Sequence, residues 1–175
     1  MQVCRTERDA ERSDGRTQDM RALMVAFASA GLFAFGGTTT SSVKTHVLGT
    51  DGIRAVVPVT WHLSREVLSV CSSPSQVMAI TNVRGPVPKR LRAGMVLILL
   101  LEDRYGRPSS FAPRTRFHVT ASPGLLAGCC DIPVGPGQEF VFRDHGRNLY
   151  AFVYVRGELT SAAETALNSL EVSAR

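Results

Sequence analysis

The chain has 175 residues, of which 44% are hydrophobic and 20% are charged. This balance predicts one packed domain with extensions and excludes a globally disordered chain. The net charge of +5 favours weak attraction to anionic surfaces. Because no nucleic-acid-binding module is recognisable, we do not expect nucleic acid as a partner, and a basic nucleic-acid-binding protein is kept only as an alternative.

The first 19 residues are nearly all polar, and their arginines and acids are balanced. Such a composition cannot bury enough apolar surface to order itself, so residues 1–19 are predicted to be a disordered leader. Secretory signals begin close to a positively charged start, and this leader does not fit that pattern. We therefore hypothesise that Met20 is the true start of the protein.

Residues 20–37 have the pattern of an export signal. Their apolar run, Ala22 to Phe35, is shorter than the ~20 residues that a bilayer span needs and matches the apolar centre of a signal peptide. We predict a signal peptide or membrane-anchor segment at 20–37, a polar linker at 38–42, and a protein that is secreted or associated with the cell envelope. The alternative is that residues 20–37 form a buried helix of the domain.

Residues 43–175 are predicted to form a single domain of short strands and one helix. Alternating polar and apolar residues predict strands at 42–48 and 53–63, joined by Asp51-Gly52 as a tight turn. Pro58 predicts an edge or a break in the second of these strands.

Further along the chain, strands are predicted at 76–83, 95–102 and 115–121. The segment 95–102, MVLILLLE, is a continuous apolar run of strand length. Such a run is typical of a central strand that is covered on both faces. The segment 115–121 alternates polar and apolar residues, as a half-buried strand does.

The last strands and the helix complete the predicted fold. Strands at 138–143 and 148–155 flank a hairpin turn that contains Gly146. Ser161 and Glu164 have the spacing of a capping box, and a helix follows them whose apolar residues recur at helical spacing. The predicted fold class is α+β, a mostly antiparallel sheet of about six to eight strands with a C-terminal helix packed on it.

Three cysteines remain after the leader, namely Cys71, Cys129 and Cys130. In an exported protein these thiols meet an oxidising environment, so we predict a disulfide from Cys71 to Cys129 or Cys130. A bond between the adjacent Cys129 and Cys130 is the second choice, because it strains the peptide between them. One thiol is left over, to pair between chains or to stay reduced.

Basic side chains give the only binding-site candidates in the sequence. A candidate anion-binding set comprises Arg84, Lys89, Arg90, Arg92, Arg143 and Arg147. If the 143–147 hairpin meets Arg114 and Arg116, the convergence of these arginines would form an anion-binding patch.

No catalytic motif accompanies the histidines. Trp61 is predicted to be a core aromatic residue, with the adjacent His62 facing solvent, and His118 alternates with a phenylalanine on a predicted strand. The sequence lacks a nucleophile elbow, a zinc-protease motif and a phosphate-binding loop, and it has no cysteine spacing that suits zinc. We therefore expect no catalytic residues, no metal site and no cofactor.

Several stretches resemble small exported proteins of actinobacterial type, many of which are lipoproteins. They are VPVTWHLS (57–64), SSPSQVMAI (72–80), MVLILLLED (95–103), EFVFRDHGRNLYAFVYV (139–155) and AAETALNSLEV (162–172). The segment LFAF (32–35) is similar to a lipoprotein signal, but Phe35 stands where the lipid-bearing cysteine would be. The strand and helix that end in LNSLEV are also distantly similar to the α/β/α sandwich of photosystem II extrinsic-type domains, which implies a binding or assembly role.

The function that these features favour is a non-enzymatic, exported domain that binds an unknown envelope partner or ligand. Contact with a membrane is expected only through an uncleaved segment 20–37. The alternative from another class is an envelope hydrolase or redox enzyme that uses His62, His118 or a reduced cysteine. An enzyme requires a concave pocket that brings two or more of those side chains within hydrogen-bond reach.

Overall fold

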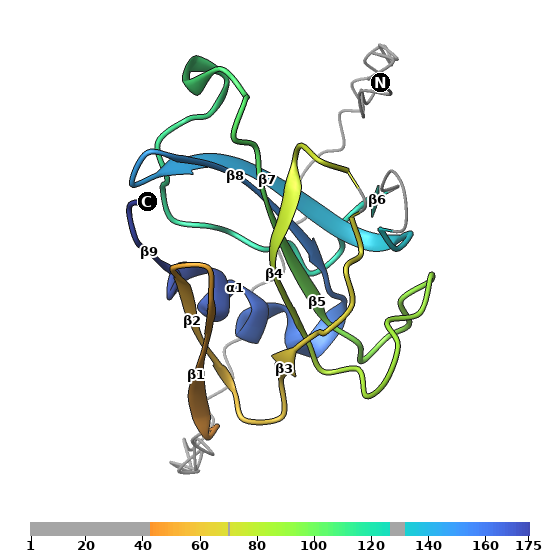
Figure 1. The fold of residues 1–175 in the computed structure, drawn as a ribbon. Helices are drawn as coiled ribbons and strands as arrows, with labels where there is room; N and C mark the ends of the chain where they lie inside the picture. The colour runs from red at the N-terminus through yellow and green to blue at the C-terminus, as the bar shows by residue number, and fades with distance from the viewer. Residues whose placement is uncertain (1–42, 70, 127–131) are drawn as a thin grey trace, which may run out of the picture. The chain divides into compact units, whose positions relative to one another are not determined.

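The structure is a computed structural model that describes residues 43–69, 71–126 and 132–175 (Figure 1). The predicted leader, signal and linker, and the cysteines at 129 and 130, lie outside the described residues. The strands are β1 (Thr45–Thr50), β2 (Ile53–Pro58), β3 (His62–Leu63), β4 (Ser75–Thr81), β5 (Leu97–Glu102), β6 (Leu125–Leu126), β7 (Gly135–Asp144), β8 (Arg147–Tyr154) and β9 (Glu171–Val172). The α-helix is α1 (Thr160–Asn168), and two short 3-10 helices lie at Pro108–Ser110 and Gly157–Leu159.

The strands form two antiparallel sheets. The large sheet has six strands in the order β3-β4-β5-β8-β7-β6, and the small sheet has three in the order β1-β2-β9. The predicted fold class, a mostly antiparallel α+β domain with a C-terminal helix, is confirmed. The second predicted strand is broken at Pro58, where β2 ends before a turn leads to β3.

The large sheet is covered on both faces, and β5 is buried along its whole length. One face, which includes Ile98 and Leu100 of β5, packs against α1 and the small sheet; we call this the first core. The other face, which includes Leu97, Leu99 and Leu101, packs against loop residues such as Leu68 and Ile132; we call this the second core. The continuous apolar run at 95–102 therefore supplies alternate residues to two cores, as predicted.

Two tight turns have the backbone conformations that their residues favour. Asp51 and Gly52, between β1 and β2, have φ angles of 49° and 73°. His145 and Gly146, between β7 and β8, have φ angles of 46° and 80°. Both pairs are typical of two-residue hairpin turns, in which glycine adopts a positive φ at no steric cost.

The start of α1 differs from the prediction. The helix begins at Thr160, directly after a 3-10 turn, and has no side-chain cap. The side chain of Glu164 instead accepts a hydrogen bond from the amide of Val119, at 2.9 Å. The predicted capping box is wrong because a neighbouring segment provides Glu164 with a donor from outside the helix.

Residues 114–120, which we call the strap, belong to no strand, and only the first of them, Arg114, forms a backbone hydrogen bond to a strand, at Arg143 of β7. Their buried residues Phe117 and Val119 point into the first core, which explains the alternating pattern in the sequence. Their backbone is held by side chains of α1 and β7. The predicted strand at 115–121 is therefore wrong, because side-chain amides and a carboxylate replace the partner strand.

No helix in the described part of the chain has the length and apolar character needed to cross a membrane.

Candidate functional site

The predicted anion-binding residues do not form one patch. Arg90 forms a bridge with Val134, immediately before β7 begins, whereas Arg143 lies near the far end of β7. Nine residues of extended chain between positions 134 and 143 span about 30 Å. The basic loop 84–94 and the β7–β8 hairpin are therefore at opposite ends of the large sheet.

Arg147 has a structural role instead of a binding role. Its side chain is only 3% exposed and forms two hydrogen bonds to the Glu102 carboxylate, at 3.1 and 2.8 Å. A third hydrogen bond, at 2.7 Å, reaches the backbone carbonyl of Asp51 in the β1–β2 turn. Arg175 also reaches Glu102, at 2.6 Å. These contacts link the large sheet, the small sheet and the C-terminus, so Arg147 is not available to a ligand.

Opposing effects act on the pKa of Glu102. Burial would raise this pKa, but the hydrogen bonds from Arg147 and the positive charges of Arg147, Arg175 and Arg104 outweigh burial and hold it below its ordinary value. Glu102 is therefore ionised and paired at neutral pH.

Arg114 and Arg143 lie side by side, so part of the convergence considered from the sequence is present. The amide of Arg114 donates to the carbonyl of Arg143 at 2.9 Å. However, the guanidinium of Arg114 pairs with Asp144 at 2.9 Å and donates to the carbonyl of Leu170 at 2.6 Å. Its charge is already compensated within the domain.

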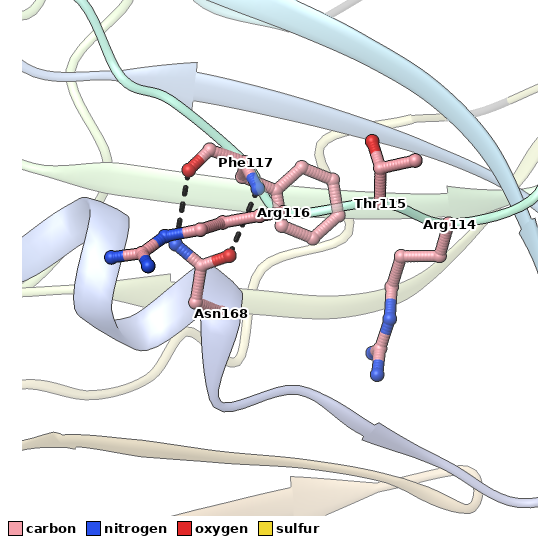
Figure 2. A pocket seen from close by; sticks show the side chains of 5 residues that line it. All are labelled: Arg114, Thr115, Arg116, Phe117 and Asn168. Atoms are coloured by element: carbon pink, nitrogen blue, oxygen red, sulfur yellow. Dashed lines mark hydrogen bonds between the residues drawn. The ribbon is translucent and has the colours of Figure 1, made fainter.

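A pocket of about 440 Å³ lies beside the strap and is lined by Arg114, Thr115, Arg116, Phe117 and Asn168. Figure 2 shows the guanidinium groups of Arg114 and Arg116 extending in different directions from the strap. The amide of Asn168 is used internally, since it accepts from the Phe117 amide at 2.9 Å and donates to the Phe117 carbonyl at 3.0 Å. With Arg114 also occupied, the polar side chains that this pocket still offers a ligand are those of Thr115 and Arg116.

A second pocket, of about 210 Å³, lies where the basic loop meets the end of the large sheet. We call it the arginine pocket. It is lined by Leu91, Arg92, Ala93, Met95, Pro136, Tyr154, Val155 and Arg156. Three chain segments meet here because β5 starts, β7 starts and β8 ends at this end of the large sheet. Within the described residues, neither Arg92 nor Arg156 forms an ion pair.

Tyr154, one of the residues that line the arginine pocket, has a buried hydroxyl without a partner. The residue is 0% exposed, and its hydroxyl has no hydrogen-bond partner in the described structure. Burial, with a smaller contribution from the charge of Glu139, raises the pKa of Tyr154 to about 12. The phenol is therefore a neutral donor at physiological pH.

Gly137 of β7 makes room for the Tyr154 ring. Gly137 is directly opposite Tyr154 in the register of the sheet. A Cβ atom at Gly137 would lie 3.1 Å from Cδ1 of Tyr154 and 2.9 Å from the carbonyl oxygen of Val153. Because both distances are shorter than ordinary contacts, the absence of a side chain at position 137 allows the ring to lie over β7.

His62, His118 and His145 lie in three different parts of the fold. His62 is half-buried and lines a separate pocket of about 310 Å³ with Arg65 and Glu66. His118 is exposed on the strap, 3.9 Å from Glu164, and His145 is exposed in the β7–β8 turn, 2.8 Å from Asp144. Trp61 is 2% exposed in the first core, as predicted. None of these three pockets holds two histidines.

Cys71 is partly exposed in the loop before β4. Since its predicted partners Cys129 and Cys130 are outside the described residues, the disulfide stays a prediction. Among the residues that the structure describes, no group of three or more His, Cys, Asp or Glu side chains is placed to hold a metal ion.

The anion-binding residues predicted from the sequence include Arg92 but not Tyr154 or Arg156. The signal that would have found them is positional. Arg156 is the first charged residue after the predicted strand 148–155, and the basic loop with Arg92 precedes the predicted strand 95–102. Antiparallel pairing of these two strands therefore brings Arg92 and Arg156 to the same end of the sheet.

Comparison with protein families, curated proteins and solved structures finds no match to this chain.

Proposed function

We propose that this chain is a non-enzymatic binding domain, exported to the cell envelope, that holds an anionic group of its ligand in the arginine pocket. The observation that carries the proposal is the presence in one pocket of two guanidinium groups that have no acidic partner among the described residues. Tyr154, which also lines this pocket, has a buried hydroxyl without a hydrogen-bond partner in the described structure. Buried polar groups without partners are rare in folded proteins, and each calls for an explanation.

The electrostatics support an anionic ligand. The first 42 residues hold equal numbers of basic and acidic residues, so the whole excess of positive charge belongs to residues 43–175. Lys89 and Arg90 precede Arg92 in the same loop and are exposed, so they add positive potential around the pocket without lining it. Such potential concentrates anions and speeds their association.

The export of the chain is part of the proposal and comes from the sequence of residues 20–37. The test is the mass of the natural protein recovered from the medium and from the envelope fraction. A mass that corresponds to a chain beginning near residue 37 supports a cleaved signal. An intact chain in the cytosol, with reduced thiols, would remove export from the proposal.

Anion binding is tested by NMR on protein labelled with ¹³C at the tyrosine ζ carbon, which is bonded to the hydroxyl. The chain has three tyrosines, so three signals report on Tyr105, Tyr150 and Tyr154. Titration with sodium acetate and with sodium phosphate, at constant ionic strength, is expected to shift the Tyr154 signal and leave the exposed Tyr105 unchanged.

Three variants decide where the anion binds. Arg92→Ala and Arg156→Ala are each expected to weaken binding about tenfold, because each removes a charge-assisted hydrogen bond. Arg84→Ala is the matched control, since Arg84 is exposed in the same basic loop but does not line the pocket. Equal losses in all three variants would mean that general charge, not the pocket, attracts the anion, and the proposal would fail.

A further inference from the structure

β1 is the outermost strand of the small sheet, with β2 on one side and an open edge on the other (Figure 1). The carbonyl of Lys44 accepts a hydrogen bond from the amide of Val59, directly after β2, at 3.0 Å. Because the backbone groups of successive residues in a strand point to opposite sides, those of Thr45, Val47 and Gly49 point to the open edge. Among the described residues, no hydrogen bond reaches these outward groups.

This edge lacks the features that keep sheet edges apart. Proteins protect exposed edges with proline, with charged side chains or with a bulge that twists the strand away. β1 contains neither proline nor an acidic or basic residue between Thr45 and Thr50. Its register with β2 is unbroken along the whole strand. The backbone of β1 is therefore suited to pairing with another strand.

The outer face of the small sheet carries exposed valines. Ile53, Ala55 and Val57 of β2 are buried in the first core, so the alternate residue Val56 faces outward. Val47 is directly opposite Val56 and shares this face, and the two residues are 61% and 38% exposed. A strand added at the open edge would extend this pair into a longer row, and cross-strand pairs of β-branched residues stabilise a sheet.

We propose that β1 pairs antiparallel with β1 of a second copy of this chain, with Val47 opposite the same residue of that copy. In this register Thr45 of each copy faces Gly49 of the other, so all the outward backbone groups of the strand find partners. Val47 and Val56 of both copies form one row across the joined sheets. The two copies are related by a twofold axis, which makes a closed dimer.

The charges at the two ends of β1 favour a second copy as the partner. Lys44 precedes the strand and Asp51 follows it, and both are exposed. Neither side chain forms an ion pair within the described residues. Antiparallel pairing brings Lys44 of each copy beside Asp51 of the other, so the attraction occurs twice. Parallel pairing would instead place like charges together.

The test begins with the mass and the amide exchange of the full chain. A contact through one six-residue strand is smaller than the interfaces of stable dimers, so the dimer is expected to be reversible. In analytical ultracentrifugation the average mass is expected to rise from 19.0 kDa toward twice that value as the concentration is raised. Hydrogen exchange at the amides of Val47 and Gly49 is expected to slow over the same range. Exchange at Leu48, which already pairs with β2, is expected to stay constant.

Variants of the edge decide whether β1 is the contact. Val47→Lys places like charges at the twofold axis and is expected to weaken dimerisation by more than about tenfold. Val67→Lys is the matched control, since Val67 is 68% exposed and lies outside the small sheet. Val47→Pro removes an outward amide proton, leaves the bonds to β2 in place, and is also expected to weaken dimerisation.

A second pair of variants tests the charges. Lys44→Glu faces Asp51 of the other copy with a like charge and is expected to weaken dimerisation about three- to tenfold. Arg65→Glu makes the same change of charge on an exposed residue outside the small sheet and is expected to have no effect.

Two results would overturn the dimer. One is a chain that stays monomeric at every concentration, with constant exchange at Val47. The other is equal association of the wild type and of both Val47 variants, which would mean that another part of the chain, such as the apolar run Ala22 to Phe35, joins the copies. Wild-type fluorescence of Trp61 in each variant shows that a loss of association is not a loss of the fold.

Discussion

The unsatisfied hydroxyl of Tyr154 makes a prediction about stability that runs against the usual effect of a core substitution. Most core substitutions destabilise a protein, whereas Tyr154→Phe is expected to stabilise the ligand-free domain. Leaving a buried polar group without a partner costs about 1–3 kcal/mol. The variant removes that cost and leaves a void of a single oxygen atom, so the free energy of unfolding is expected to rise by about 1 kcal/mol.

The assay is urea denaturation followed by the fluorescence of Trp61. It is the only tryptophan in the chain, and its 2% exposure means that unfolding changes its environment completely. Tyr105→Phe is the matched control, since it removes the same atom from a residue that is 84% exposed. The control is expected to change the free energy of unfolding by less than about 0.5 kcal/mol.

The pKa of Tyr154 adds a pH dependence with a defined sign. The unfolded phenol loses its proton near pH 10 and the folded one at about 12. Between these values the unfolded state binds fewer protons, so the wild-type protein loses stability as the pH rises, by about 1.4 kcal/mol per unit from this group. The advantage of Tyr154→Phe over wild type is therefore expected to be constant below pH 10 and to grow above it. A variant that is destabilised by 1 kcal/mol or more at pH 7, or a difference that stays flat from pH 8 to 11.5, would refute the reasoning.

Three other substitutions test the remaining packing. Glu102→Gln leaves Arg147 buried without a counter-charge and is expected to destabilise the domain by about 3 kcal/mol in urea at pH 7. Because the pKa of Glu102 is lowered in the fold, this loss of stability is present above about pH 4.5 and shrinks as the wild-type carboxylate protonates at lower pH. A loss of stability that is equal at pH 7 and pH 2.5 would contradict the pairing of Glu102 with Arg147. Asn168→Ala removes both hydrogen bonds to the strap, so it is expected to lower the free energy of unfolding by about 1–3 kcal/mol and to speed hydrogen exchange at the Phe117 amide. Asn168→Asp keeps one acceptor and is expected to lose less stability. Unchanged exchange in the alanine variant would rule out this contact. Gly137→Ala is expected to lower the free energy of unfolding by about 1–3 kcal/mol, because its Cβ would contact backbone and the Tyr154 ring, and a neutral effect would mean that β7 can shift away.

The sequence alone determined the features that depend on neighbouring residues. The turn at Asp51-Gly52 follows from residues that tolerate a positive φ, and the hairpin around Gly146 has the same cause. The burial of β5 on both faces follows from a continuous apolar run, because a strand with a solvent-facing side would carry polar residues at every second position. The fold class follows from the number of such segments and the single amphipathic helix at the end.

Only the tertiary structure decided what the polar side chains do. Arg147 and Arg92 were both predicted from the sequence to bind anions, yet Arg147 is buried against Glu102 and Arg92 lines a pocket. Likewise, Glu164 has the spacing of a cap but binds the amide of Val119. The physical reason is that a charged or hydrogen-bonding group pairs with whichever partner the fold brings within about 3 Å. For both Arg147–Glu102 and Glu164–Val119, that partner is 45 residues away in the sequence.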